Sequence, residues 1–229
     1  MPHTLDSEKV LYTISRLEDR IGERFPDASL LNVCSEFYGI AKDSRRRIEW
    51  IDKPNYLLRW GIGSLIAISL VVLCYTVSLL DLRVKLPDLP ELIQLMEALF
   101  NDIILISAAI FFLVSIEMRV KRARALESLH ELRGLAHVVD MHQLTKDPDM
   151  ILATYQLTNS SPKNELNAFQ LRRYLDYCSE LLALIGKVAA MYSEKLPDPE
   201  IVNAASDVEE LCTNLSRKIW QKIVTIENH

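Results

Sequence analysis

The chain has 229 residues, a length that corresponds to one domain or two small ones. Its 26 basic and 31 acidic residues leave a net charge of −5, which argues against a nucleic-acid-binding protein, and an apolar content of 49% excludes global disorder. Because only 6 residues are glycine, tight turns between strands are scarce, and the composition favours helices.

Residues 1–55 are predicted to form an N-terminal arm of two helices. Apolar residues recur at every third or fourth position of the first helix, which places them on one face: Val10, Ile14, Leu17, Ile21 and Phe25. Pro26 ends this helix, and Asp27 is expected to cap a second one that carries its own apolar set: Leu30, Cys34, Phe37 and Ala41. The simplest arrangement is an antiparallel helical pair.

Residues 61–80 form an uncharged apolar stretch of 20 residues. At about 1.5 Å per residue this stretch is long enough for the roughly 30 Å hydrocarbon core of a bilayer. It predicts a first transmembrane helix over about 60–81. Trp50, Tyr56 and Trp60 lie just before or at its start, where amphipathic rings suit the headgroup layer.

A second span is predicted over 99–118, around the uncharged residues 103–116. Asp102 and Glu117 fall inside it, each within a turn of a membrane edge, where a charge costs less than at the centre. Residues 56–118 are therefore interpreted as a transmembrane hairpin with a short external loop over 82–98. Pro87 and Pro90 mean that this loop cannot be regular helix throughout.

Basic residues flank the two spans and are scarce between them. Six precede the first span and five follow the second, whereas the connecting segment has two, Arg83 and Lys85. The flanking set is Lys42, Arg45, Arg46, Arg47, Lys53, Arg59, Arg119, Lys121, Arg122, Arg124 and Arg133. By the positive-inside rule, both termini are cytoplasmic, and the protein is expected to be integral to an inner or plasma membrane.

Residues 119–229 are predicted to form a C-terminal cytoplasmic helical domain. The second span continues as one helix from 103 to 145, with apolar residues at helical spacing: Leu126, Leu129, Leu132, Ala136 and Val139. Pro148 follows the end of this helix, because a proline disfavours helix at the residue before it. A shorter helix over 149–157 and a polar loop over 158–164 are expected next.

Two long amphipathic helices complete the prediction. Residues 165–195 carry apolar residues on too wide a face for a single neighbour, which indicates the central helix of a bundle. Asp198 is a natural N-cap for the last helix, with Pro199 at its first position and apolar residues from Ile201 to Ile223. The predicted fold class is all-α, with a transmembrane hairpin and a cytoplasmic helical bundle built from both arms.

The chain carries no catalytic, metal-binding or cofactor-binding motif that we can identify, so no enzyme, cofactor or metal is predicted. Its four cysteines are widely separated and lack a C-x-x-C pair, which favours reduced, buried thiols: Cys34, Cys74, Cys178 and Cys212.

A polar stripe on the helix after the second span is the first candidate site. Glu127, His130, His137 and Asp140 share one face. His130 and His137 lie about 10.5 Å apart along the axis and cannot hold one ion together. We favour a polar stripe against neighbouring helices or solvent over a metal, proton or pH-sensing site.

Three further features bear on the membrane segment. Gly63 and Ala67 form a small-x-x-x-small pair suited to close packing against the second span or a second copy. Asp102 either reaches water at the outer edge or faces a polar cavity. The basic runs are expected to set topology and contact anionic lipid: Arg45, Arg46, Arg47, Arg119, Lys121, Arg122 and Arg124.

Two functions from different classes fit these features. The favoured hypothesis is a membrane-anchored helical scaffold or interaction module that presents its cytoplasmic bundle, including a coiled-coil seam on the helix leaving the membrane, to a cytosolic protein or to further copies. The alternative is a small oligomeric cation channel or membrane-perturbing effector in which Asp102 forms an acidic ring. A homo-oligomer is expected in both cases, since the wide apolar faces exceed what one chain readily covers.

Overall fold

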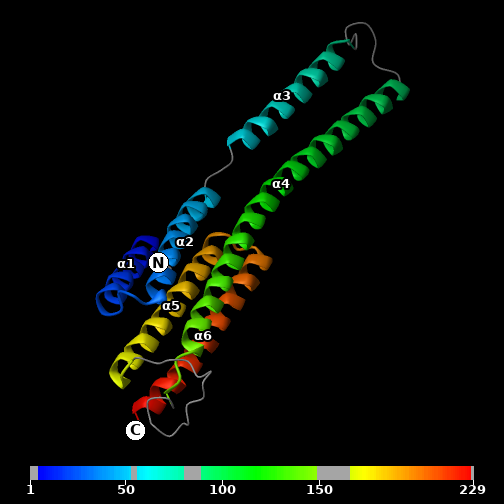
Figure 1. The fold of residues 1–229 in the computed structure, drawn as a ribbon. Helices are drawn as coiled ribbons and strands as arrows, with labels where there is room; N and C mark the ends of the chain where they lie inside the picture. Colours follow the sequence, from blue (N-terminus) through cyan, green and yellow to red (C-terminus); the bar gives the residue numbers. More distant parts are fainter. Residues whose placement is uncertain (1–4, 53–55, 80–88, 149–165, 228–229) are drawn as a thin grey trace. The chain divides into compact units, whose positions relative to one another are not determined.

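The computed structural model describes residues 5–52, 56–79, 89–148 and 166–227, and these residues form helices and connecting turns with no strand. The predicted all-α class is confirmed for this part of the chain. Figure 1 shows its six helices: α1 (Ser7–Arg24), α2 (Ser29–Asp52), α3 (Tyr56–Leu79), α4 (Leu89–Leu144), α5 (Ala168–Lys195) and α6 (Pro199–Glu227).

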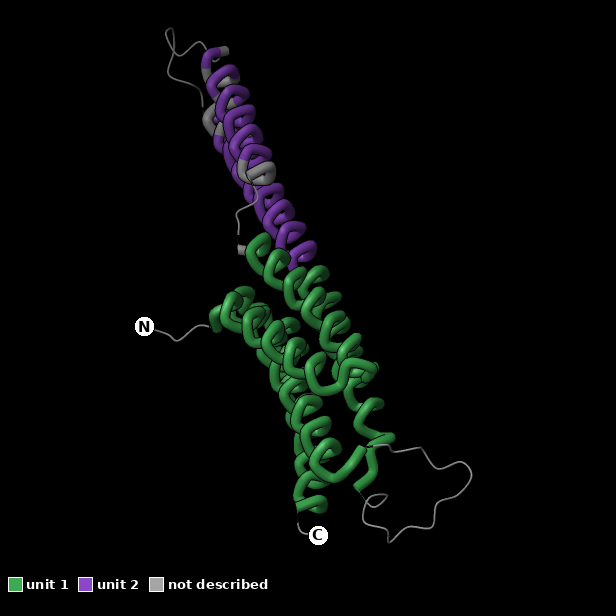
Figure 2. The backbone as a smooth tube through the Cα atoms, turned by 60° about the vertical axis from the view of Figure 1, so that its left-hand side comes forward, with its two compact units in different colours: residues 1–52, 122–229 green, residues 53–121 purple. Residues whose placement is uncertain are grey.

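The chain divides into two compact units (Figure 2). Unit 1 combines residues from both ends of the chain, 1–52 and 122–229, and contains α1, α2, the second part of α4, α5 and α6. Unit 2 consists of residues 53–121 and contains α3 and the first part of α4. α4 is therefore the one described helix that belongs to both units.

α1 and α2 form the helical pair predicted for the N-terminal arm (Figure 1). Val10, Ile14, Leu17 and Ile21 are all buried on one face of α1. The Asp6 carboxylate caps α1 by accepting from the backbone N–H groups of Glu8 and Lys9.

One capping prediction for this hairpin is wrong. α2 begins at Ser29, one residue later than a cap at Asp27 requires, and Asp27 lies in the turn. Ala28 directly precedes the helix, and its carbonyl accepts from the Leu31 N–H at 3.0 Å. Pro26 and Asp27 form a turn in which the Ala28 N–H donates to the Phe25 carbonyl at 3.1 Å, and the helix begins after it.

α4 is longer than predicted at its N-terminal end. It runs for 56 residues from Leu89, so residues 89–98, expected in the external loop, are helical. Pro90 is tolerated because it lies in the first turn, where backbone N–H groups make no hydrogen bond within the helix and the lack of one costs nothing. The continuous helix predicted from 103 onward is confirmed to Leu144.

α5 occupies the centre of unit 1, as its wide apolar face predicted. Fourteen of its residues are buried, and it packs closely against α1, α2 and α6. Asn167 and Gln170 form a capping box at its start, in which each side chain accepts from the other residue's backbone N–H.

α6 returns antiparallel to α5 and approaches it closely. A Cβ built on Gly186 of α5 lies 3.8 Å from Cys212 Cβ and from Glu209 Cα of α6, so the two helices are in van der Waals contact there. At the far end, Arg172 pairs with Glu227 at 2.8 Å. Asp198 caps α6 as predicted, because its Oδ1 accepts from the Glu200 N–H at 3.0 Å.

Several predictions lie outside the described residues: the helix over 149–157, the polar loop over 158–164, residues 82–88 of the external loop, and the side chains of Lys53, Tyr56 and Arg59.

Candidate functional site

The first part of α4 is apolar and exposed. By length and composition, the segment Leu99–Leu144 is the one helix of the described chain that could cross a membrane. No residue in the most apolar stretch of this segment is buried. Phe111, for example, is 76% exposed and Phe112 is 64% exposed. Large aromatic side chains in this state indicate a surface that another apolar phase or molecule covers.

α3 differs from its prediction. The described apolar stretch within it, Trp60–Val72, is shorter than a full membrane span. A two-span hairpin is therefore not shown, since the one described helix that is long and apolar enough to cross a membrane is α4. Side chains in this stretch are nevertheless exposed, including Ile68 at 63%.

The small residues Gly63 and Ala67 of α3 lie on an exposed part of the described helix. Gly63 and Ala67 are exposed, and no described atom outside the local helix lies within 4 Å of a Cβ built on Gly63. On α4, the Asp102 side chain is half-buried. Further along α4, Glu117 and Lys121 form an ion pair at 2.7 Å.

Five of the basic residues expected to contact lipid have partners inside unit 1: Arg45, Arg46, Arg47, Arg122 and Arg124. Arg47 of α2 donates to the Ser128 hydroxyl of α4 at 2.6 Å and lies 3.6 Å from the Glu131 carboxylate. Arg45 donates to Glu8 of α1 and to Glu49 at 2.8 and 2.9 Å, and these hydrogen bonds raise its pKa. Arg45 therefore joins α2 to α1, and Arg47 joins α2 to α4.

Arg124 contacts a residue of another helix, whereas Arg46 contacts only a residue of its own helix among the interactions described. The Arg124 guanidinium lies 4.3 Å from the centre of the Trp50 ring, a cation–π contact between α4 and α2. Trp50, expected at the headgroup layer, is thus a partner of this arginine. Arg46 pairs with Asp43 within its own helix.

Arg122 joins α4 to the turn between α5 and α6. Its Nε and Nη2 donate to Oδ2 of Asp198 at 3.0 and 2.6 Å, and its Nη1 donates to Glu200 at 3.1 Å. The hydrogen bond to Asp198 is the main cause that raises the pKa of Arg122. The Asp198 side chain is only 6% exposed, so this acid needs the cation beside it.

A buried polar cluster lies where α2, α4 and α5 meet. Tyr192 of α5 is fully buried, and its hydroxyl makes no hydrogen bond of normal geometry, although the Ser44 and Ser128 hydroxyls lie close to it. Ser44 and Ser128 are buried beside it, and the Ser128 hydroxyl donates to the Arg124 carbonyl while it accepts from Arg47. Burial raises the pKa of Tyr192, and the nearby serine hydroxyls oppose this rise.

Lys222 of α6 holds the C-terminal end of α4. Its Nζ donates to the carbonyls of Gln143 and Lys146 at 2.8 and 3.1 Å, and the Gln143 carbonyl also accepts from the Lys146 N–H at 3.1 Å. Its positive charge also suits the negative end of the helix dipole. Burial lowers the pKa of Lys222, and Asp147 and Asp140 oppose this change.

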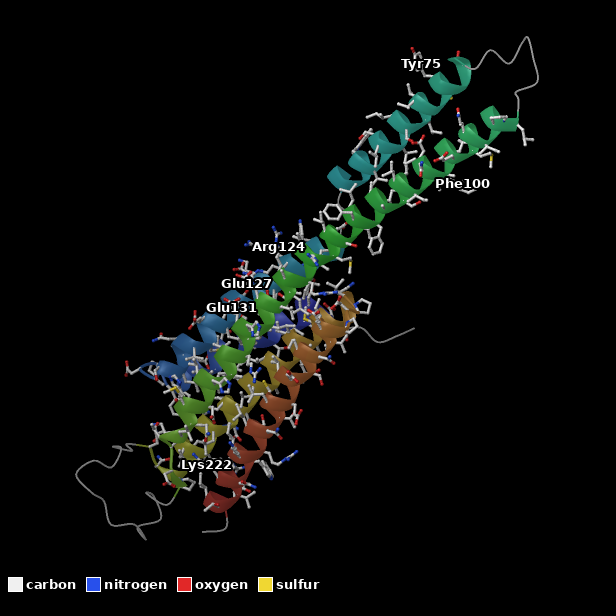
Figure 3. All side chains as sticks on the ribbon, turned by 90° about the vertical axis from the view of Figure 1, so that its right-hand side faces the viewer. Tyr75, Phe100, Arg124, Glu127, Glu131 and Lys222 are labelled. Carbon is white, nitrogen blue, oxygen red and sulfur yellow. The ribbon has the colours of Figure 1, made fainter. Side chains whose placement is uncertain are left out.

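The predicted polar stripe of α4 lies on the surface of unit 1. Glu127, His130 and His137 are exposed and Asp140 is half-buried (Figure 3 labels Glu127). Asp140 accepts from Gln143 Nε2 at 2.6 Å. Within the described residues, no group of three or more His, Cys, Asp or Glu side chains is placed to hold a metal ion. The stripe therefore has the placement of the solvent-facing alternative.

The four cysteines are free, and three of them are buried as predicted. Burial raises the pKa of Cys34, Cys178 and Cys212 to about 12, which makes these thiols unreactive at neutral pH. Cys74 of α3 is exposed, in contrast to the prediction. In a soluble environment this would be an unusual position, but it lies within the apolar stretch of a predicted span.

Comparison with known proteins adds no relative. The chain matches no protein family, no curated protein and no solved structure.

Proposed function

We propose that the protein is a membrane-anchored helical interaction module. In this proposal a two-span hairpin fixes the chain in a bilayer, both termini are cytoplasmic, and unit 1 is presented to protein partners, including further copies. No catalytic role is part of the proposal.

The observation that carries this proposal is that unit 1 is built from residues on both sides of unit 2 in the sequence. Residues from before and after unit 2 are bonded to each other there: Arg20 of α1 pairs with Glu180 of α5, and Arg47 of α2 donates to Ser128 of α4. A single crossing between residues 53 and 121 would put these partners on opposite sides of a membrane. An even number of crossings keeps them together, and this supports α3 and the apolar part of α4 as two spans.

The energetics of insertion support the span in α4. Residues 103–116 include ten Ile, Leu, Phe or Val residues, each worth about −0.3 to −0.6 kcal/mol at a helix centre on a biological insertion scale. Their sum, about −3 to −6 kcal/mol, favours insertion, and Asp102 lies near the end, where its cost is small. α3 has 24 residues and a length of about 36 Å, enough to cross beside it.

Topology mapping tests the proposal. Reporter fusions at residues 1 and 229 and an insertion at residue 85 are made in the full chain, together with alkaline extraction of the membranes. Both termini are expected inside, residue 85 outside, and the chain in the extracted pellet. A terminus outside, or release of the chain by alkali, contradicts the anchored hairpin.

Conductance distinguishes the module from a cation channel. The purified chain is reconstituted in planar bilayers and compared with Asp102→Asn. The module predicts silent bilayers for both proteins. Cation current that is lost in Asp102→Asn would replace the module with the channel.

A further inference from the structure

The buried polar side chains of unit 1 gather where α4 meets the other helices. In the part of the chain that the structure describes, the buried polar or charged side chains other than tyrosine are Ser44, Ser128, Gln143 and Asp198. Ser128 and Gln143 belong to α4, and Asp198 accepts from Arg122 of α4. Ser44 lies beside the Tyr192 hydroxyl, as Ser128 does. The surface that α4 covers is therefore the polar part of the interior.

Two buried groups on this surface are poorly satisfied. The Tyr192 hydroxyl and the Oε1 atom of Gln143 make no hydrogen bond of normal geometry. Water would satisfy both groups if α4 moved away, so they lower the cost of separating α4 compared with an apolar contact of the same size. The apolar contact itself is limited, because two of the six apolar side chains that α4 buries are alanine: Ala125, Leu129, Leu132, Leu135, Ala136 and Val139.

Charged side chains at the edge of this contact hold α4 in place. Arg122 of α4 donates to Asp198 at the turn between α5 and α6, and Lys222 of α6, labelled in Figure 3, donates to two carbonyls at the C-terminal end of α4. Between these two points, Arg47 of α2 donates to Ser128. The side chains of Arg122 and Arg47 are 35% and 38% exposed, so water competes for their contacts.

α1, α2, α5 and α6 are held to one another without α4. α5 packs closely against the other three helices. Phe25, directly after α1, lies edge-on to Tyr174 and Tyr177 of α5, with 5.7 and 6.2 Å between ring centres. Arg20 of α1 also pairs with Glu180 of α5. These four helices therefore form a core, here named the four-helix core, whose contacts do not depend on α4.

We propose that α4 is a detachable helix, whose part in unit 1 moves away from the four-helix core as one element while the core stays packed. In the attached state, the contacts of Arg47, Arg122 and Lys222 hold α4. In the detached state, water reaches the buried polar groups and the faces of the core that α4 covers. The two states differ by the position of one packed helix, a common form of conformational switch.

Detachment regulates what unit 1 presents and goes beyond the proposed interaction module. It uncovers apolar side chains that the attached state buries, so the surface available to a partner differs between the two states. α4 also carries the apolar segment of unit 2. The equilibrium between the states therefore sets how firmly that segment is linked to the four-helix core. Every contact in this argument lies within unit 1, so the inference does not require a membrane.

Two native cysteines distinguish detachment of α4 from unfolding of the core. Cys178 of α5 lies beside Lys146, just after α4, and beside Lys222, which holds that end of α4. Cys34 of α2 lies beside Glu18 of α1, inside the four-helix core. Both thiols are fully buried with a pKa raised to about 12, so each reacts only after its surroundings open. Detachment opens the surroundings of Cys178, and unfolding of the core opens those of Cys34.

Thiol labelling of the full chain tests the proposal. The purified chain in detergent micelles is treated with excess N-ethylmaleimide at mildly alkaline pH, and labelling of each cysteine is followed by the mass of its peptide. We expect Cys178 to be labelled at least tenfold faster than Cys34, because α4 detaches more often than the core unfolds. Equal rates, or slower labelling of Cys178, overturn the proposal, since Cys178 would then be reached only when the whole bundle unfolds.

Variants far from Cys178 test whether α4 moves as one element. Arg122→Gln weakens the attachment at the opposite end of the part of α4 in unit 1, and the matched control Arg46→Gln removes an arginine that is 70% exposed and pairs within α2. Arg122→Gln is expected to speed labelling of Cys178 about tenfold and to leave Cys34 nearly unchanged, whereas Arg46→Gln changes neither. An equal increase at both cysteines overturns the proposal, as does an unchanged rate at Cys178.

A second variant acts without the buried acid at the turn between α5 and α6. Leu129→Ala removes apolar contact from the inner face of α4, and Leu17→Ala makes the same change within the four-helix core, at a side chain of α1 that is also buried. Leu129→Ala should speed labelling of Cys178 alone, and Leu17→Ala should speed labelling of Cys34. The same response to both variants overturns the proposal. Release of the chain from membranes by alkali contradicts the membrane anchor and leaves this inference standing.

Discussion

Replacing Tyr192 with phenylalanine is expected to stabilise the protein. The Tyr192 hydroxyl is buried and makes no hydrogen bond of normal geometry, and the nearby Ser128 hydroxyl already accepts from Arg47 and donates to the Arg124 carbonyl. A buried polar group left unpaired costs about 1–3 kcal/mol, and phenylalanine keeps the packed ring. We therefore expect Tyr192→Phe to raise the free energy of unfolding by about 1–2 kcal/mol.

The measurement is urea unfolding of the full chain in detergent micelles, followed by far-ultraviolet circular dichroism. For a domain of this size, 1 kcal/mol corresponds to about 2–4 °C in Tm, so thermal scans should show a rise of about 2–8 °C. Tyr12→Phe is the control, because Tyr12 is 68% exposed and its hydroxyl meets water. This control should change the free energy by less than about 0.5 kcal/mol.

A second readout uses pH. Burial raises the pKa of Tyr192 above its ordinary value of 10.0, so the folded state keeps a proton that the unfolded state loses. Stability from this group is complete below pH 10 and is lost as pH rises beyond it, and Tyr192→Phe removes that loss. A decrease of more than about 1 kcal/mol at neutral pH would refute the reasoning, because it would show that the hydroxyl is bonded to Ser44 or Ser128.

Two further predictions concern charge and burial in unit 1. Lys222→Met is expected to lower the free energy of unfolding by about 1–2 kcal/mol, because two charge-assisted hydrogen bonds to the end of α4 are lost from a half-buried site; Lys218→Met at an exposed position of α6 is the control, and equal unfolding midpoints would contradict the prediction. For Cys178, whose pKa is raised from 9.0 to about 12, stability is complete below pH 9 and is lost progressively up to pH 12. At pH 10.5 this loss is about 2 kcal/mol, so the difference in unfolding free energy between pH 8 and pH 10.5 should shrink by that amount in Cys178→Ala, and an unchanged difference would exclude burial as the cause.

The helices and their buried faces were largely predictable because their signals are local. The spacing of Val10, Ile14 and Leu17 identified a face that is buried in the structure, and Pro26 marked the break between α1 and α2. The wide apolar face of α5 likewise indicated its central place. Each of these signals lies within a few turns of one helix, where the period of the chain decides which residues share a face.

The partners of the charged residues could not be predicted, because they are distant in sequence. Asp198 was recognised as a helix cap from its neighbours, but its ion pair with Arg122 spans 76 positions. The Tyr192, Ser44 and Ser128 cluster likewise depends on how α2, α4 and α5 are placed together. The start of α4 is not predictable from Pro90, because a proline indicates a loop in most positions but is accepted in the first turn of a helix.

The arginines that indicate topology in the sequence are also structural, and this dual use gives a last prediction. Arg122 pairs with the nearly buried Asp198, whereas Arg46 is 70% exposed and pairs with Asp43 in its own helix. Reversing either charge changes the positive-inside balance by the same amount. Only Arg122→Glu, however, also places a second acid beside Asp198 and detaches α4 from the turn between α5 and α6.

The two effects can be measured separately in membranes. Reporter activity at the termini is expected to change to the same small extent in Arg46→Glu and Arg122→Glu. Resistance of unit 1 to limited proteolysis is expected to be lost in Arg122→Glu and retained in Arg46→Glu. Equal proteolysis of the two variants would show that the Arg122 contacts do not hold the bundle together. In the proposed membrane anchoring, these basic residues would then serve topology alone, because their charge and not their partners would be the property that matters.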